Sequence, residues 1–284
     1  MSQIALFAEI CWPILADMVQ TGLRRSGWIC LAVCLGLALP CTSRAQEPPQ
    51  KDVNQQAQFW WSWNNTLRFT DTFGAVADFH IRRNDFVQDP SFYFVRFGAN
   101  YWVNDQMTFT LGYAHMWQAP AREDWATWSD ENRIYQQLQY RSKWGRVSAL
   151  NRLRNEQRWQ EKIEQDVATG GTKFTNRIRY LLSLAIPVAE NTAVPVLVLS
   201  DEILVQMGSE VVYNPFDQNR FFVGIKQALT GDLNFDFGYM LVYQQKASGY
   251  QYDMNHTLRW FFYYAPDFRK DRGKTPAPHM EGEE

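Results

Sequence analysis

Apolar and polar residues alternate along most of this chain, from residue 58 to residue 264. Near the end of this region, Leu258, Trp260 and Phe262 alternate with Thr257 and Arg259. A period of two places one set of side chains on each face of a β-strand. The pattern predicts eleven strands, at residues 59–69, 74–83, 92–103, 107–118, 133–143, 146–159, 174–186, 193–207, 220–229, 233–244 and 253–264.

The length of these stretches suits a membrane, because about ten residues tilted by about 45° cross the hydrocarbon of a bilayer. A closed sheet is the β architecture that leaves no unpaired edge in lipid. We therefore expect an all-β, antiparallel, up-and-down transmembrane β-barrel. Short connections at 70–72, 104–105, 144–145, 187–191 and 230–232 alternate with longer ones at 84–91, 119–132, 160–173, 208–219 and 245–252. Outer-membrane barrels have short periplasmic turns and longer extracellular loops.

The number of strands is in tension with this orientation. With eleven strands and the long loops outside, the first strand would start on the extracellular side. Bacterial single-chain barrels have even strand numbers, so we expect about twelve. The remaining strand could lie within 47–57, the N-terminal segment could thread the lumen, or one strand could be wrongly divided or missed.

The N-terminal region predicts export. Arg24 and Arg25 precede an apolar core from Trp28 to Leu39 and a small residue at Ala45, the pattern of a cleaved secretory signal. All four cysteines lie within the first 41 residues, so the exported chain would hold no disulfide. We expect a signal peptide at 1–45 with a true start at Met18, a flexible segment at 46–57, the barrel at 58–268 and a disordered tail at 269–284. The protein would then lie in the outer membrane of a Gram-negative bacterium.

Composition narrows the classes further. Aromatic residues make up 15% of the chain, yet the mean hydropathy is −0.40, which is too low for a helical membrane protein. A net charge of −2 and the lack of a long basic run give no sign of nucleic-acid binding. The histidines are scattered and no metal or cofactor motif is present, so no cofactor is expected. The expected partners are outer-membrane lipid, lipopolysaccharide and the machinery that inserts barrels.

The inward face of the predicted strands is rich in charge. Charged residues are costly in lipid but tolerated inside a wet barrel. The expected lumen network contains twelve cations, four acids and one histidine: Arg68, Arg82, Arg96, Arg133, Arg141, Arg152, Arg154, Arg158, Arg177, Arg179, Lys226 and Arg259, with Asp78, Glu156, Glu202, Asp236 and His80.

Two functions fit this network. Bidentate Arg–Glu and Arg–Asp ladders could brace and close a structural barrel from within. Alternatively, the excess of positive charge could draw a small anionic solute into a narrow, anion-preferring, porin-like pore or a solute-binding barrel. A barrel of about twelve strands lies between those that side chains fill and those that leave a channel.

A lipid-modifying enzyme embedded in the membrane is a further alternative. His115 and His256 have outward parity near the predicted extracellular end, and Ser248 lies in the loop before His256. A serine and a histidine can form a catalytic dyad when a third polar group orients the histidine. No tighter motif supports it, so no catalytic residue is predicted. Trp125 and Trp128 could bind a ligand outside, but such a loop more often folds over its own barrel mouth.

Several short motifs share an order with one protein family. They include Phe59-Trp60-Trp61, Arg96-Phe97-Gly98, Leu111-Gly112-Tyr113, the run from Asn151 to Arg158, Ser200-Asp201-Glu202, Asn219-Arg220-Phe221-Phe222-Val223-Gly224 and Phe237-Gly238-Tyr239. In this order the chain resembles a family of uncharacterised bacterial outer-membrane proteins catalogued as domain of unknown function 2490. The resemblance covers residues 59–264 and implies an outer-membrane barrel without an established activity. The chain departs from the family at His115, where an aromatic residue is usual, and in its high tryptophan content.

Overall fold

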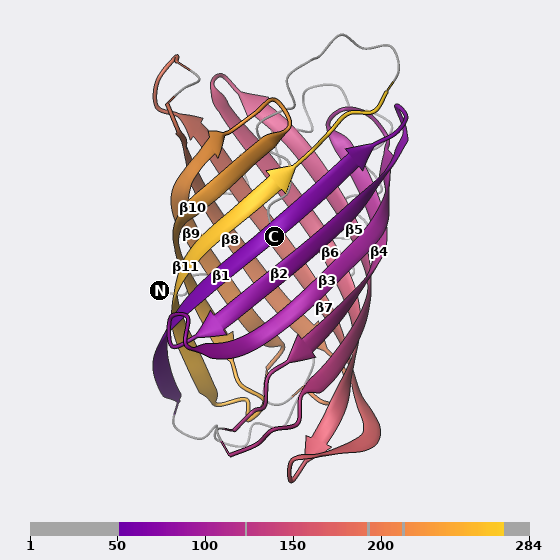
Figure 1. Ribbon diagram of the computed structural model, residues 1–284, viewed down its shortest axis with the longest axis vertical. Coiled ribbons are helices and arrows are strands. Elements are labelled where there is room, and N and C mark those ends of the chain that lie inside the picture. The colour runs from indigo at the N-terminus through magenta and orange to yellow at the C-terminus, as the bar shows by residue number, and fades with distance from the viewer. Residues whose placement is uncertain (1–50, 123, 192–193, 212–213, 270–284) are drawn as a thin grey trace. The chain divides into compact units, whose positions relative to one another are not determined.

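The computed structural model describes residues 51–122, 124–191, 194–211 and 214–269. These residues form eleven strands that close into one barrel (Figure 1). The strands are β1 (Asp52–Arg68), β2 (Phe73–Asn84), β3 (Asp89–Trp102), β4 (Met107–Gln118), β5 (Ser129–Trp144), β6 (Val147–Glu164), β7 (Val167–Pro187), β8 (Val196–Met207), β9 (Phe216–Ala228), β10 (Leu233–Gln245) and β11 (Gln251–Tyr264). Among the described residues, no helix is long and apolar enough to cross a membrane.

Each strand pairs antiparallel with the next one along the chain, and the barrel closes where β1 and β11 run parallel. Figure 1 shows both strands ending at the top, which we call the upper end of the barrel. The closing register places Trp61 opposite Trp260. Strands that reverse at every turn return to their first direction after an odd number, so eleven strands can close only through a parallel pair. The predicted antiparallel, up-and-down barrel is confirmed for every pair of consecutive strands, but the expected even number is wrong for the described residues, and the closing pair is parallel.

The first strand begins earlier than predicted. Residues 52–57, expected to be flexible, form the start of β1 and pair with β11 from Asp52 onward. They are a continuation of β1 and not a twelfth strand. β1 begins at the lower end of the barrel, which is the end that carries the connections predicted to be long. The count of eleven strands had placed the start of the first strand at that end. The expected signal peptide, residues 46–50 and the tail beyond Arg269 lie outside the described residues.

The connections are also more even in length than predicted. The expected long loop at 160–173 is instead a hairpin in which β6 and β7 continue to a two-residue turn at Gln165 and Asp166. Both turn residues have positive φ, 51° and 62°, which is the geometry that favours tight hairpins. The sequence hid this hairpin because polar residues occupy both of its faces. The difference in loop length that suggested an orientation is therefore smaller than expected.

The two faces of the sheet differ as the alternation predicts. Outward side chains such as Phe97, Leu111 and Trp260 are between 40% and 54% exposed. Inside, an apolar cluster joins Trp60 of β1 to side chains of β8–β11, including Phe222 and Phe261. Charged side chains of β5–β9 fill the adjoining part of the interior, and Arg220 lies over the Trp60 ring of the apolar cluster. The lumen is thus filled partly by apolar packing and partly by ion pairs.

Two pairs of inward glycines make room for aromatic rings. Gly98 faces Gly112 across β3 and β4, and a Cβ atom at Gly112 would lie 2.5 Å from the ring of Tyr135. Gly224 faces Gly238 across β9 and β10 in the same way, beneath the ring of Phe222. An aromatic ring over a glycine in a strand replaces the missing side-chain packing. Tyr135 comes from β5 and Phe222 from two residues before Gly224, so the rings over the glycines are not their immediate neighbours in the sequence.

Candidate functional site

Glu156 is the centre of an ion-pair cluster between β6 and β7. It lies opposite Arg177 in the strand register and accepts hydrogen bonds from Arg177 at 2.8 Å and from Arg179 at 2.9 Å. Arg154 and Arg133 approach the same carboxylate at 3.6 Å and 3.9 Å. Arg154 and Arg179 face each other directly, so this carboxylate separates like charges that the register brings together.

Glu202 on β8 joins a second group of arginines to the first. Its carboxylate accepts hydrogen bonds from Arg152 at 2.8 Å, from Arg179 at 2.9 and 3.0 Å, and from Arg220 at 3.3 Å. Arg179 therefore bridges Glu156 and Glu202. The Glu202 side chain is 1% exposed, which makes it a buried acid shared by three guanidinium groups.

Three members of this network were missed by the sequence reasoning. Glu131 on β5 is fully buried and binds both Arg133 and Arg158. Asp217 on β9 binds Arg177 at 2.9 Å, and Arg220 binds Glu202 as described above. Residues 131 and 217 fell in predicted loops because β5 and β9 begin earlier than expected. Continuing the inward parity of Arg133 back by two residues would have found Glu131.

Two further ion pairs lie apart from this cluster. Asp78 of β2 binds Arg96 of β3, and Asp236 of β10 binds Arg259 of β11. Tyr263 also donates a hydrogen bond to Asp236, at 2.7 Å. Each pair joins register partners or near neighbours on adjacent strands. Such pairs brace the sheet from within.

The remaining predicted lumen residues use aromatic partners. The guanidinium of Arg82 lies 3.4 Å from the centre of the Trp60 ring, and Lys226 lies 4.7 Å from that of Tyr263. His80 is fully buried and stacks on Phe94 at 4.1 Å. Arg68 is at the upper rim, where it binds Asp105 at 3.3 Å and stacks against Trp102.

These side chains close the interior of the barrel. Arg152, Arg259, Glu202, Asp236 and His80 project inward from five different strands, and none of them is more than 1% exposed. A water-filled channel would leave charged side chains accessible. The described part of the chain therefore forms a filled barrel and not an open tube.

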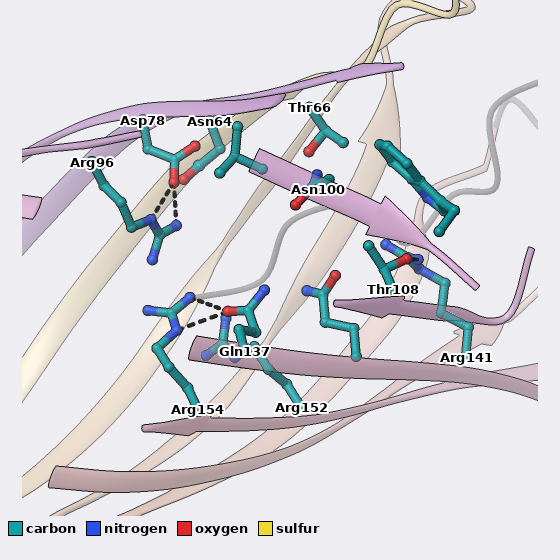
Figure 2. Close-up of a pocket in the computed structure, with 13 residues that line it drawn as sticks. Asn64, Thr66, Asp78, Arg96, Asn100, Thr108, Gln137, Arg141, Arg152 and Arg154 are labelled. Carbon is teal, nitrogen blue, oxygen red and sulfur yellow. Dashed lines mark hydrogen bonds and ion pairs between the residues drawn. The ribbon is translucent and has the colours of Figure 1, made fainter. Parts of the chain in front are cut away.

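A polar cavity remains between this filled region and the upper end. Figure 2 shows side chains of β1–β3 facing those of β5 and β6 across it. The cavity has a volume of about 30 Å³, which is room for about two water molecules. Four arginines and one carboxylate line it, together with amides, hydroxyls and two apolar side chains: Arg96, Arg141, Arg152, Arg154, Asp78, Asn64, Asn100, Gln137, Gln139, Thr66, Thr108, Val76 and Trp102.

The arginines of the cavity are held in place by their neighbours. Arg154 donates two hydrogen bonds to Gln137, at 2.5 and 2.7 Å. On the other wall of the cavity, Asp78 of β2 accepts a hydrogen bond from Arg96 of the adjacent strand β3 (Figure 2). Arg141 is half-buried and reaches Thr108 at 3.5 Å. The lining has one acid for four guanidinium groups, while Arg152 and Arg154 also contact Glu202 and Glu156 behind the cavity wall.

The outward histidines contact tyrosine and polar side chains. His115 lies 3.0 Å from Asn132 and 3.8 Å from Asp130, while His256 lies 2.7 Å from the hydroxyl of Tyr239. The hydroxyl of Ser248 instead accepts a hydrogen bond from the backbone of Gln251. The arrangement does not bring this serine and a histidine together as a dyad would require.

The tryptophan loop before β5 lies against its own barrel. Trp128 stacks on Tyr93 of β3 at 5.7 Å. The carboxylate of Asp166, in the β6–β7 turn, accepts hydrogen bonds from the backbone of Thr127 at 2.7 Å and of Ala126 at 2.9 Å. The hydrogen bond from Thr127 and, to a smaller extent, that from Ala126 lower the pKa of the Asp166 carboxyl. The loop is thus fastened to the hairpin that the sequence had not predicted.

The fold and the interior can now be compared with known proteins. A family model described as protein of unknown function (DUF2490) matches residues 57–253, which run from β1 into the start of β11. The chain belongs to this family. The DUF2490 match contains every member of the charged network except Arg259. No curated protein and no solved structure matched the chain.

Proposed function

We propose that this DUF2490 barrel lies in the bacterial outer membrane and binds a small anion in its arginine-lined cavity, without conducting solutes. The membrane location is supported by the exposed apolar and aromatic side chains that spread over the outer face of β9–β11 and β1–β3, since soluble monomers rarely expose large contiguous apolar patches. It is also supported by the export signal predicted at 1–45. Lipid and lipopolysaccharide would surround such a barrel, and the insertion machinery would place it there.

Anion binding rests mainly on the composition of the cavity. Arg96, Arg141, Arg152 and Arg154 supply planar donors that match the oxygens of phosphate, sulfate or a carboxylate. One lining carboxylate, Asp78, already binds Arg96. The small size of the cavity selects an inorganic anion or the end of a larger acid. The filled interior below it argues against a continuous pore.

A lipid-modifying enzyme has less support. His115 and His256 lie on the outer face, but their contacts are Asn132, Asp130 and tyrosines. A hydrolase would need a nucleophile within hydrogen-bond reach of one of them.

Titration of the refolded barrel with phosphate or sulfate tests the binding proposal. We expect saturable binding that weakens with added salt. Gln139→Glu places a second carboxylate in the cavity, and we expect binding at least ~10-fold weaker, since a hydrogen bond to a charged group contributes ~1.5–3 kcal/mol. Its melting temperature should not fall, because the new acid lies among arginines.

Arg122→Gln is the matched control for a loss of positive charge. Arg122 is exposed in the loop at the other end of the barrel, whereas Arg141 lines the cavity. Arg141→Gln should weaken binding and Arg122→Gln should not. Equal affinities in the wild type, Arg141→Gln and Gln139→Glu would show that the cavity is not an anion site.

A further inference from the structure

The outer face of the barrel has two unlike sides. Over β9–β11 and β1–β3 the outward side chains between the ends of the strands are mostly apolar or aromatic, such as Phe221, Trp260 and Phe97. A polar exception is Asn219 of β9, which binds Asp201 of β8. Over β5–β7, several amide side chains share the outward face, and four of them are joined to one another by hydrogen bonds. We call this group the amide patch: Gln136 of β5, Asn155 and Gln157 of β6, and Asn176 of β7.

The amide patch is a connected set of hydrogen bonds. Gln136 donates to Gln157 at 3.1 Å, and Asn155 donates to Gln136 at 3.2 Å. Gln157 donates to Gln136 at 3.2 Å and to Asn176 at 3.5 Å. Four amides carry eight N–H donors, and these bonds use four. The patch therefore has side-chain N–H groups beyond the four that these bonds use, and its four side chains are half-buried.

The patch lies inside the apolar band if the barrel spans a membrane. Trp159 of β6 and Phe174 of β7 pair on the outer face with ring centres 5.4 Å apart, as aromatic residues of an interface girdle do. Asn155 lies four residues before Trp159 on β6, which is roughly 9 Å deeper for a strand tilted by about 45°. Lipid tails offer no hydrogen-bond partner there, so exposed amides are costly.

We propose that a second copy of this chain covers the amide patch, so that the protein forms a homodimer through the outer face of β5–β7. This inference rests on the proposed membrane location. A neutral amide is both donor and acceptor, so the same patch can pair with itself about a two-fold axis. Exposed apolar side chains flank it, namely Ile134, Leu138 and Leu153, at 39–43% exposure. Polar contacts with an apolar rim suit association within a bilayer.

Single-cysteine cross-linking in outer-membrane preparations tests this proposal. The chain has no cysteine after Cys41, so an introduced thiol is unique in the exported protein. Leu153→Cys and Leu138→Cys lie opposite each other beside the patch. We expect one or both to give an oxidation-dependent band at twice the monomer mass. Phe237→Cys, 38% exposed on the apolar side, is the matched control and should remain monomeric.

A second pair of variants separates association from folding. Gln136→Leu with Gln157→Leu removes the donors without introducing charge, and we expect it to abolish the cross-link while the barrel still shifts on a gel when heated. Monomer at all three cysteine positions, or a cross-linked band of another mass, would overturn the homodimer. If the protein is missing from the outer-membrane fraction, the proposed location fails instead, and fractionation of the same sample reports this separately.

Discussion

Glu202→Gln should destabilise the folded barrel by ~3 kcal/mol or more, because it leaves three buried arginines with one carboxylate fewer. Breaking one partner of a buried ion pair typically costs ~3–5 kcal/mol. Arg152 and Arg220 both depend on this carboxylate, and Arg179 shares it with Glu156. Denaturant unfolding of the refolded barrel, with heat resistance on a gel as a second readout, measures the loss.

Two comparisons make this result specific. Arg179→Gln should cost less, because Arg152 and Arg220 keep Glu202 and Arg177 keeps Glu156. Glu164→Gln removes an exposed acid of β6 and should change stability by less than ~0.5 kcal/mol. Equal melting of all three variants would mean that Glu202 does not hold the interior together.

Gly112→Val should destabilise the barrel by ~1–3 kcal/mol through overpacking. A Cβ atom at this position meets the Tyr135 ring at 2.5 Å, and that ring is also held near the guanidinium groups of Arg96 and Arg154, at 5.5 and 5.2 Å. The ring therefore has little freedom to move away. Denaturant unfolding in detergent micelles measures the change.

The control is a glycine with open space. Nothing lies within 4 Å of a Cβ atom at Gly231, so Gly231→Val should be close to neutral. In a Tyr135→Ala background the cost of Gly112→Val should shrink, because the clash is gone. A cost that is unchanged in that background would mean that the ring does not set the need for glycine.

The alternation of side chains made most of the fold predictable. Each inward residue that was predicted from parity, from Asp78 on β2 to Arg259 on β11, lies on the inner face, since a strand offers only two faces. The family resemblance stated from the short motifs agrees with the matched family model. The eleven stretches counted in the sequence correspond to the eleven strands of the described residues, whereas the expectation of about twelve strands was wrong.

Three features could not be read from the pattern, each for a physical reason. The parallel closure depends on pairing between the two ends of the chain, which local alternation does not encode. The extended β6–β7 hairpin is polar on both faces, so it resembles a loop. Glu131 and Asp217 lie within the first three residues of β5 and β9, where the alternation of polar and apolar residues is weakest. The amide patch was visible as outward polar residues, but its meaning needed the register of β5–β7.

The closed interior is the central claim, and electrical recording from the refolded wild-type barrel in a planar bilayer tests it most directly. Insertion is verified in the same membranes by protease protection. The filled interior predicts no steady single-channel current in salt solution, including when an anion occupies the cavity as proposed. A sustained current from verified wild-type barrels, whether selective for anions or for cations, would contradict the account.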